Sequence, residues 1–361
     1  MTRSTPAGFG LCVLALSIGS AIAAPHAGGA VSVVLTPSYE KSMQEIGSAV
    51  RLTMRNDSNK PVRMLKWQTP FYGLNHDLFD ISVGGQEIEY VGAWYKRGAP
   101  GKDDWMVLKA GESRSIDVDL SEVYPFQASG QYEIKFSTLV NDYDEKLLSK
   151  AGSANEMQSF PLVRWVDGSD QFMQSDAGLD ASLGVKALNP TPTFESCSTT
   201  RQSQLNTALN SARSYGVNAD NYFTSKTWST VTTRYRTWFG TATSSRFNTG
   251  KSNFDKIENA LANTRITFNC SCTQNYYAYV YPTQPYRVYL CNAFWSAPNT
   301  GTDSRAGTII HELSHFDVLA NTDDVAYGQT AAKSLANSNP TKALKNADSH
   351  EYFSENTPAQ N

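Results

Sequence analysis

Charged residues are scarce in this sequence, and neither sign dominates. Only 18% of the 361 residues are Asp, Glu, Lys or Arg, and the formal net charge is −3. Proteins that bind nucleic acid or an anionic membrane surface rely on an excess of Lys and Arg. The composition therefore argues against nucleic acid and membrane as partners. We expect a globular protein that is a monomer.

Long apolar runs are absent except near the N-terminus. A membrane-spanning helix needs about 20 apolar residues, and only residues 11–22 form a comparable, shorter run. Arg3 precedes this run, and residues 21–23 read Ala-Ile-Ala. A basic start, a short apolar core and an A-x-A site are typical of a secretory signal peptide. We expect residues 1–23 to be removed and the mature protein to be extracellular.

Cysteine is also rare, with five in the chain, and Cys12 falls within the expected signal peptide. The other four are an even number in an oxidising compartment, which favours disulfides. They are Cys197, Cys270, Cys272 and Cys291. Cys270 and Cys272 are too close to pair easily with each other, so two pairings stay open. A four-cysteine zinc site is the alternative, but the C-x₂-C spacing of such sites is missing.

Histidine is equally scarce, and two of the five histidines stand in one short motif, His311-Glu312-Leu313-Ser314-His315. On a helix, residues four apart lie on one face, so both imidazoles can bind one zinc ion. Zinc lowers the pKa of bound water from about 15.7 towards about 7. Glu312 can then act as general base and return the proton to a leaving amine. The motif predicts zinc-dependent peptide hydrolysis.

The flanks of the motif support a buried helix. Apolar residues surround it at helical spacing, and Asp303 or Ser304 is the expected N-cap. These apolar residues are Ile309, Ile310, Leu313 and Phe316.

A catalytic zinc ion needs a third protein ligand and one open position. The nearest acidic candidates are Asp317, Asp323 and Asp324. Asp317 follows His315 by two residues, so it should point to another face of the same helix. Asp323 and Asp324 follow residues 321–322, Asn-Thr, where we expect the helix to stop and the chain to turn. The residue types alone leave both aspartates open.

The His-Glu-x-x-His motif and the segment Thr-Asp-Asp-Val-Ala-Tyr-Gly at residues 322–328 together resemble the aspzincins. This family comprises deuterolysin and the peptidyl-Lys metalloendopeptidases, and its second motif is Gly-Thr-x-Asp-x-x-Tyr-Gly. The resemblance covers about residues 195–361 and departs at Asn321, where the family has Gly. It implies one zinc ion, with Asp324 as the third ligand. It also implies that Tyr327, expected one helical turn beyond Asp324, hydrogen-bonds the oxyanion.

Asp348 and Glu351 are three residues apart, and Glu355 follows one turn later, so a helix would carry them as an acidic strip. Most such strips are solvated. The resemblance implies instead that Asp348 and Glu351 line the pocket for the residue after the cut and select lysine there. The alternative is a broad-specificity, deuterolysin-like protease. His350 is expected to pack or lie on the surface rather than bind metal.

The resemblance also resolves the disulfides. It implies the pairs Cys197–Cys270 and Cys272–Cys291.

The N-terminal part of the chain has a different character. Within residues 24–165, short alternating runs such as residues 49–54, 81–83 and 132–136 are typical of strands. Turn signals separate them, so we expect an antiparallel β-sandwich.

Residues 166–193 are small and polar and are typical of a linker that contains the processing region. Residues 194–361 show helical spacing, interrupted by an expected β-ribbon at about residues 266–291. The fold class is α+β, a β-sandwich followed by a mainly helical, zincin-like catalytic domain.

A signal peptide, a sandwich, a linker and a protease in this order indicate a secreted zymogen. The sandwich would be a propeptide that covers the cleft and inhibits its own protease. Residues 94–104 are expected as an exposed basic loop, although Lys96 or Lys102 could enter the acidic pocket as a substrate mimic. Two other hypotheses stay open: a sandwich kept as a module that binds substrate or a surface, and a structural protein with a chance motif.

Overall fold

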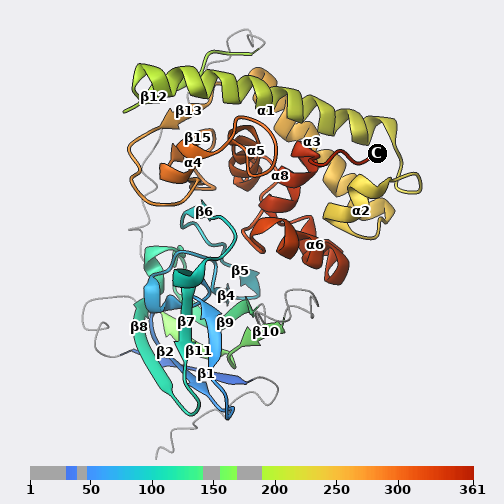
Figure 1. Cartoon of the computed structure of the whole chain (residues 1–361). Helices are drawn as coiled ribbons and strands as arrows, with labels where there is room; N and C mark the ends of the chain where they lie inside the picture. Colours follow the sequence, from blue (N-terminus) through green and yellow to red (C-terminus); the bar gives the residue numbers. More distant parts are fainter. Residues whose placement is uncertain (1–29, 39–46, 141–154, 169–188) are drawn as a thin grey trace, which may run out of the picture.

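The computed structural model describes residues 30–38, 47–140, 155–168 and 189–361. The predicted signal peptide and most of the predicted linker lie outside these residues. A sheet-rich region precedes a mainly helical region, which agrees with an α+β fold (Figure 1).

The N-terminal region contains two antiparallel sheets. The first has the order β1-β2-β8, and the second has the order β10-β9-β4-β5, with β11 also paired to β9. The strands of the first sheet are β1 (Val31–Pro37), β2 (Ala49–Asn56) and β8 (Ser113–Asp119). Those of the second are β4 (Phe79–Val83), β5 (Gln86–Glu87), β9 (Gly130–Val140), β10 (Asn155–Gln158) and β11 (Leu162–Val166). The alternating runs noted in the sequence lie on β2, β4 and β9.

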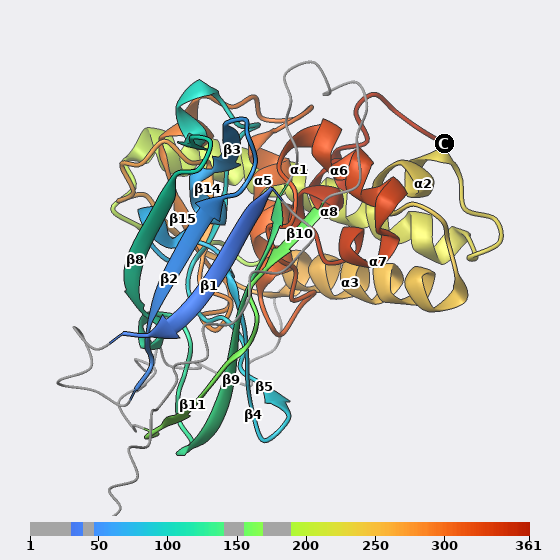
Figure 2. The same ribbon diagram turned by 90° about the horizontal axis from the view of Figure 1, so that it is seen from below.

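One apolar core joins these two sheets. Leu52 and Met54 of β2 face inward and belong to the same buried cluster as Ile81 of β4 and Ile134 of β9. Alternate residues of a strand point to opposite faces, so each strand contributes every second side chain to the core. Figure 2 shows β1, β2 and β8 of the first sheet next to β9, β10 and β11 of the second.

Short elements connect the sheets. The strands β3 (Val62–Leu65) and β7 (Trp105–Leu108) form a separate antiparallel pair. The described residues of this region also form the 3₁₀ helices η1 (Lys66–Gln68), η2 (Pro70–Tyr72), η3 (Lys102–Asp104) and η4 (Leu120–Glu122).

The C-terminal region is built from helices around one buried helix, α5. The long helix α1 packs on α3 and α5, and α8 packs on α5 (Figure 1). The helices are α1 (Thr199–Ser225), α2 (Thr233–Phe239), α3 (Ser244–Asn263), α4 (Asn292–Ser296), α5 (Arg305–His315), α6 (Gly328–Ser338), α7 (Pro340–Ala343) and α8 (Ala347–Glu355).

A mixed sheet lies beside α5, where the sequence predicted only a β-ribbon. Its order is β12-β13-β15-β14-β6, and β13 runs parallel to both β12 and β15. The strands are β12 (Thr193–Glu195), β13 (Thr267–Asn269), β14 (Ala278–Val280), β15 (Arg287–Leu290) and β6 (Trp94–Lys96). The edge strand β6 comes from the N-terminal region, so this sheet joins the two parts of the chain.

The disulfides are Cys197–Cys270 and Cys272–Cys291, the pairing that the resemblance implied. They fix the start of α1 to the end of β13 and close the loop that leads to α4. All four cysteines are used, so the alternative of a four-cysteine zinc site is wrong.

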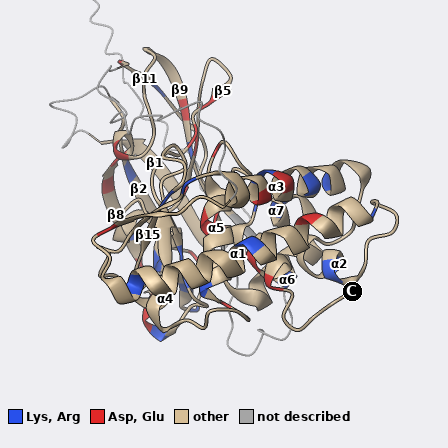
Figure 3. Ribbon diagram, turned by 90° about the horizontal axis from the view of Figure 1, so that it is seen from above, with Lys and Arg blue, Asp and Glu red and all other residues tan. Residues whose placement is uncertain are grey.

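Charges of both signs occur along α1 and α3 (Figure 3), in agreement with the small net charge. None of the described helices is long and apolar enough to cross a membrane.

Candidate active site

Helix α5 carries the His-Glu-x-x-His motif in the interior of the helical region. Ser304 is its N-cap, because the Ser304 hydroxyl accepts a hydrogen bond from the Gly307 N–H at 2.9 Å. Glu355 of α8 accepts in turn from the Ser304 N–H at 2.8 Å and from the Ser304 hydroxyl at 2.7 Å. His311 and His315 are fully buried, as the apolar flanks predicted.

Helix α5 ends at His315, so the prediction of a stop at Asn321–Thr322 is wrong. Asp317 lies beyond the helix end and is exposed. The chain turns at once, because the Thr322 N–H donates to the Ser314 carbonyl at 3.1 Å. Asn321 has a φ of 47°, the left-handed conformation that Gly or Asn adopts most readily. The turn brings the following residues back over the histidines.

Asp324, not Asp323, faces the two histidines. Its Oδ1 lies 3.1 Å from His311 Nε2 and 3.5 Å from His315 Nε2. The Asp323 main chain instead pairs with residues 345–347, since its N–H donates to the Lys345 carbonyl and its carbonyl accepts from the Ala347 N–H. One ligand atom from each of His311, His315 and Asp324 lies within 4.8 Å of the others.

These three side chains fit a zinc ion. His315 Nδ1 donates to the Thr322 carbonyl at 2.7 Å, which leaves the Nε2 lone pair directed at the site. Both Nε2 atoms and Asp324 Oδ2 are buried and make no hydrogen bond within the described part of the chain. Buried polar atoms normally have partners, so this cluster is suited to hold a cation. Two imidazoles and one carboxylate match the ligands that catalytic zinc takes.

Electrostatics support the same conclusion. Burial tends to raise the pKa of Asp324, but His315 and His311 outweigh it and hold this pKa well below its usual range. The carboxylate is therefore ionised and ready to bind a cation. Burial raises the pKa of Glu312 well above the usual value, which makes it a stronger base. Glu312 is fully buried, and neither carboxylate oxygen has a hydrogen-bond partner among the described residues.

Tyr327 does not lie on a helix with Asp324, so that expectation is wrong. It is the N-cap of α6, after a non-helical segment. Asn346 holds this segment, because its side-chain oxygen accepts from the Ala326 N–H at 2.9 Å. Gly328 then has a φ of 83°, which favours glycine, and its N–H donates to Asp348 Oδ2 at 2.6 Å. Tyr327 is buried, and its hydroxyl accepts a hydrogen bond from Arg97 Nη1 at 3.0 Å.

The acidic strip lies on a helix, α8, as predicted, and it is buried, so the alternative of a solvated face is wrong. Asp348, Glu351 and Glu355 are 1%, 0% and 5% exposed. Asp348 Oδ1 lies 3.0 Å from His311 Nδ1, and Glu351 Oε2 lies 3.3 Å from the same atom. The strip therefore touches the histidine cluster directly. Burial and the neighbouring Glu351 raise the pKa of Glu355, which accepts hydrogen bonds from the N-cap residue Ser304, to about 9.

Lys96 of the N-terminal region fills the space between these carboxylates. Its Nζ lies 2.5 Å from Glu351 Oε2, 3.8 Å from Asp348 Oδ1 and 3.9 Å from Asp303 Oδ1. Burial opposes its charge, but these carboxylates outweigh burial and hold the pKa of the ammonium well above its usual value. The prediction of an exposed loop is wrong at Lys96, although Lys102 is exposed.

Sequence reasoning missed two residues of this pocket. Asp303 forms its third carboxylate, and the Tyr352 hydroxyl donates to Asp303 Oδ1 at 2.6 Å. The Tyr277 ring lies 4.9 Å from Lys96 Nζ. Asp303 was considered only as a helix cap, and no spacing signal connects Tyr277 with α8.

Strand β6 enters the site alongside Lys96. It pairs antiparallel with β14, with Lys96 opposite Ala278. The Trp94 ring stacks on the His315 ring, with centroids 5.7 Å apart and planes 8° apart. An extended segment thus lies over the histidines and places a lysine in the acidic pocket.

His350 belongs to the core, in agreement with its predicted packing role. Its Nε2 lies 3.0 Å from Asn253 Nδ2, and its ring packs against Phe239 and Phe254. Burial lowers the pKa of His350 to about 4.

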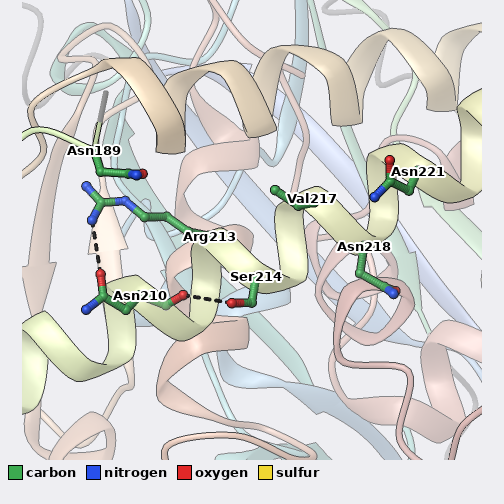
Figure 4. Close-up of a pocket in the computed structure, with 7 residues that line it drawn as sticks. All are labelled: Asn189, Asn210, Arg213, Ser214, Val217, Asn218 and Asn221. Atoms are coloured by element: carbon green, nitrogen blue, oxygen red, sulfur yellow. Dashed lines mark hydrogen bonds between the residues drawn. The ribbon is translucent and has the colours of Figure 1, made fainter. Parts of the chain in front are cut away.

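A separate groove of about 600 Å³ runs along the outer face of α1 (Figure 4). It is lined mainly by amide side chains, and Arg213 is tied to Asn210 and to the Pro190 carbonyl. It contains no acid or nucleophile suited to hydrolysis, so we assign the chemistry to α5.

A buried helix that carries two histidines and a glutamate, with an aspartate turned back onto the histidines, defines a zinc-dependent hydrolase. Comparison with known proteins makes the assignment specific. A family model for the aspzincins, described as lysine-specific metallo-endopeptidase, matches residues 223–355. An extracellular protease of Aeromonas hydrophila is 42% identical over 363 residues, which cover 100% of both chains. A peptidyl-Lys metalloendopeptidase of Armillaria mellea is 36% identical over 98% of this chain and 97% of its own.

A zinc peptidase from Grifola frondosa is 49% identical and covers 46% of this chain and 100% of its own, with a TM-score of 0.44. On the full-length matches, the chain belongs to the aspzincin family of zinc metalloendopeptidases.

The position of Asp324 generates a first prediction. Asp324→Ala should lose both bound zinc and proteolytic activity, because it removes the only carboxylate that faces both Nε2 atoms among the described residues. Asp323→Ala is the matched control and should keep both, since the Asp323 main chain makes the structural contacts. Zinc content by elemental analysis and cleavage of a denatured protein measure the two effects. The reverse result for the two variants would show that the ligand is Asp323.

Proposed function

We propose that this protein is a secreted zinc endopeptidase that cuts on the amino side of lysine and is made as an inactive precursor. The observation that carries the proposal is the lysine ammonium of Lys96, buried between Glu351 and Asp348 next to His311.

His311, His315 and Asp324 would hold the zinc ion. When bound there, zinc acts as a Lewis acid that polarises the substrate carbonyl and lowers the pKa of water towards about 7. Glu312 follows His311 on α5 and would accept the proton of the attacking water. It would then deliver that proton to the amine that leaves. The raised pKa of Glu312 suits both steps, because the group must take up a proton and release it again.

Tyr327 would donate a hydrogen bond to the oxygen on which negative charge develops. Its hydroxyl is buried at the cleft, and burial raises its pKa well above the usual value, so it stays a donor. A single donor of this kind contributes about 2.7–4 kcal/mol to the transition state.

Lysine selectivity would come from Asp348 and Glu351. Their carboxylates are fully desolvated, so they favour a cation that can replace the lost water. A compact ammonium fits between them, whereas the wide guanidinium of arginine needs more room. The peptidyl-Lys metalloendopeptidases among the relatives support this assignment. The alternative is a broad-specificity protease. Relatives named as neutral protease 2 homologues are 24–25% identical to this chain.

The N-terminal sandwich would be the inhibitory propeptide. In support, β6 covers the histidines, Lys96 fills the pocket, and Arg97 engages the Tyr327 hydroxyl. A peptidyl-Lys metalloendopeptidase of Pleurotus ostreatus matches only 168 residues of this chain, which are 98% of its own length. That length suffices for the helical region alone. Secretion is supported by the two disulfides and by the relative named as an extracellular protease.

The general-base role leads to a second prediction. Glu312→Gln should keep the zinc ion and lower kcat by about 10²–10⁴-fold, because it removes the proton acceptor and leaves the ligands in place. The measurement combines zinc content with turnover of a lysine-containing peptide. A zinc-loaded variant with normal turnover would contradict the role.

The pocket carboxylates lead to a third prediction. Cuts in a denatured protein should fall before lysine, and Glu351→Gln should lower kcat/KM for lysine by about 10²–10³-fold, because one buried partner of the ammonium is lost. Glu355→Gln, on the same helix, should keep the preference, since its carboxyl has a pKa of about 9 and caps α5. Mass spectrometry gives the cut sites. Cuts without regard to lysine would favour the broad-specificity alternative.

The covered cleft leads to a fourth prediction. Lys96→Met keeps much of the side-chain volume but leaves Glu351 and Asp348 buried without their cation, which costs about 3–5 kcal/mol. The intact variant chain should therefore open and gain activity by about 10²–10³-fold.

Lys102→Met is the matched control, because Lys102 is exposed, and this variant should stay as inactive as the parent chain. Activity is measured before any processing, with the chain length checked by mass. A parent chain that is as active intact as when processed would contradict the precursor proposal and favour a sandwich that binds substrate or a surface.

A further inference from the structure

Strand β6 also indicates where the neighbours of a bound lysine lie. Side chains alternate along an extended strand, so Tyr95 leaves β6 on the face opposite to Trp94 and Lys96. Tyr95 pairs directly with Tyr279 of β14. Its ring lies 5.4 Å from the Tyr279 ring and 5.1 Å from the Tyr276 ring, centroid to centroid. The residue before the buried lysine therefore rests on two tyrosines of the helical region.

These two tyrosines form a firm surface of their own. The Tyr279 ring stacks on the Tyr289 ring of β15, with centroids 4.6 Å apart and planes 3° apart. Tyr276 stands at the start of the same edge, where the Ala293 N–H donates to its carbonyl at 3.0 Å. Neither contact involves the sandwich, so the Tyr279 ring and the Tyr276 main chain keep these partners when β6 leaves. The Tyr276 ring itself contacts Tyr95 and, at 5.0 Å, the Arg97 guanidinium.

A peptide substrate can add to the free edge of β14 as β6 does, because an exposed strand edge offers unpaired N–H and C=O groups. The Tyr277 N–H donates to the Lys96 carbonyl at 3.0 Å. It would then donate to the carbonyl of the substrate lysine. With the substrate lysine in the pocket of Asp348 and Glu351, the residue before it takes the place of Tyr95.

We propose that Tyr276 and Tyr279 form a subsite for the residue that directly precedes the cut, and that this subsite prefers aromatic side chains. The inference rests on the proposed function, because it assumes that Lys96 marks the position of the substrate lysine. Aromatic pairs at these distances prefer edge-on or tilted geometry, which is the geometry that Tyr95 shows.

The test uses enzyme matured from the full chain and a series of peptides Ala-Xaa-Lys-Ala, in which Xaa is Tyr, Phe, Ala or Glu. The expected kcat/KM is about 3–10-fold higher for Tyr and Phe than for Ala, the size of effect that one aromatic contact gives. Tyr279→Ala and Tyr276→Ala should each reduce this ratio. Tyr279→Phe should retain it, since the ring remains.

Tyr281→Ala is the control, because Tyr281 packs edge-on against Tyr279 and Tyr289 but makes no ring contact with Tyr95. This variant should keep the ratio. Each ratio compares kcat/KM for two substrates on the same variant. A smaller fraction of folded enzyme lowers both values equally and leaves the ratio unchanged. Equal losses in the Tyr281 and Tyr279 variants, or equal rates for all Xaa, would overturn the subsite. A failure to cut before lysine with any Xaa would instead overturn the proposed function.

Discussion

The need to neutralise buried carboxylates on α8 governs the rest of this structure. Asp348 and Glu351 are buried away from water. A charged carboxylate that is buried without a partner is strongly disfavoured. The two side chains can be stable there only beside a cation or a hydrogen-bond donor. In the full chain Lys96 supplies the cation, while His311 and the Gly328 N–H supply the donors. Any molecule that displaces Lys96 must bring a comparable positive charge.

The same carboxylates would connect the proposed lysine specificity with the proposed metal centre. Asp348 lies on His311 Nδ1, and a carboxylate in this position orients the ring and strengthens the opposite nitrogen as a ligand. The proposed lysine pocket and the proposed zinc ligands would therefore share one set of charges, because Asp348 and Glu351 contact both Lys96 and His311. A substrate lysine in this pocket would change the electric field at His311, so lysine binding and the properties of the proposed metal centre would be coupled.

The local pattern of the sequence was sufficient to predict α5, the strands β2, β4 and β9 and the burial of the His pair. Helical spacing and a serine cap are short-range signals, and they proved reliable. The path from His315 to Tyr327 was not predictable in the same way, because long-range contacts hold it: Asn346 binds the Ala326 N–H, and Asp323 pairs with the chain before α8. Only the resemblance pointed to Asp324, and it could not show that the segment is non-helical.

The placement of Lys96 lay beyond sequence reasoning for a related reason. β6 has only three residues, too few to show a period, and its partner β14 lies far along the chain. The basic residues around it are typical of a surface loop. Lys96 is buried because the carboxylates of α8 accept its charge. Neither the sequence of β6 nor that of α8 alone indicates that Lys96 and these carboxylates meet.

A strand of three residues is too short to hold a cleft closed by itself, since a free peptide with the same residues would leave easily. The sandwich supplies what the strand lacks. Trp94 packs edge-on against Tyr90 and His76, and the Arg97 guanidinium lies 4.9 Å from the Trp67 ring. These contacts hold β6 from within the N-terminal region, so if this region acts as the proposed propeptide, β6 would lose little conformational entropy when it covers the histidines. The sandwich and the helical region belong to one chain, so β6 binds the helical region intramolecularly. This linkage gives β6 a high effective concentration at the site. Under the precursor proposal, a cut between the two regions would remove the tether, so the same contacts would hold β6 only as a separate ligand and its occupancy of the site would fall.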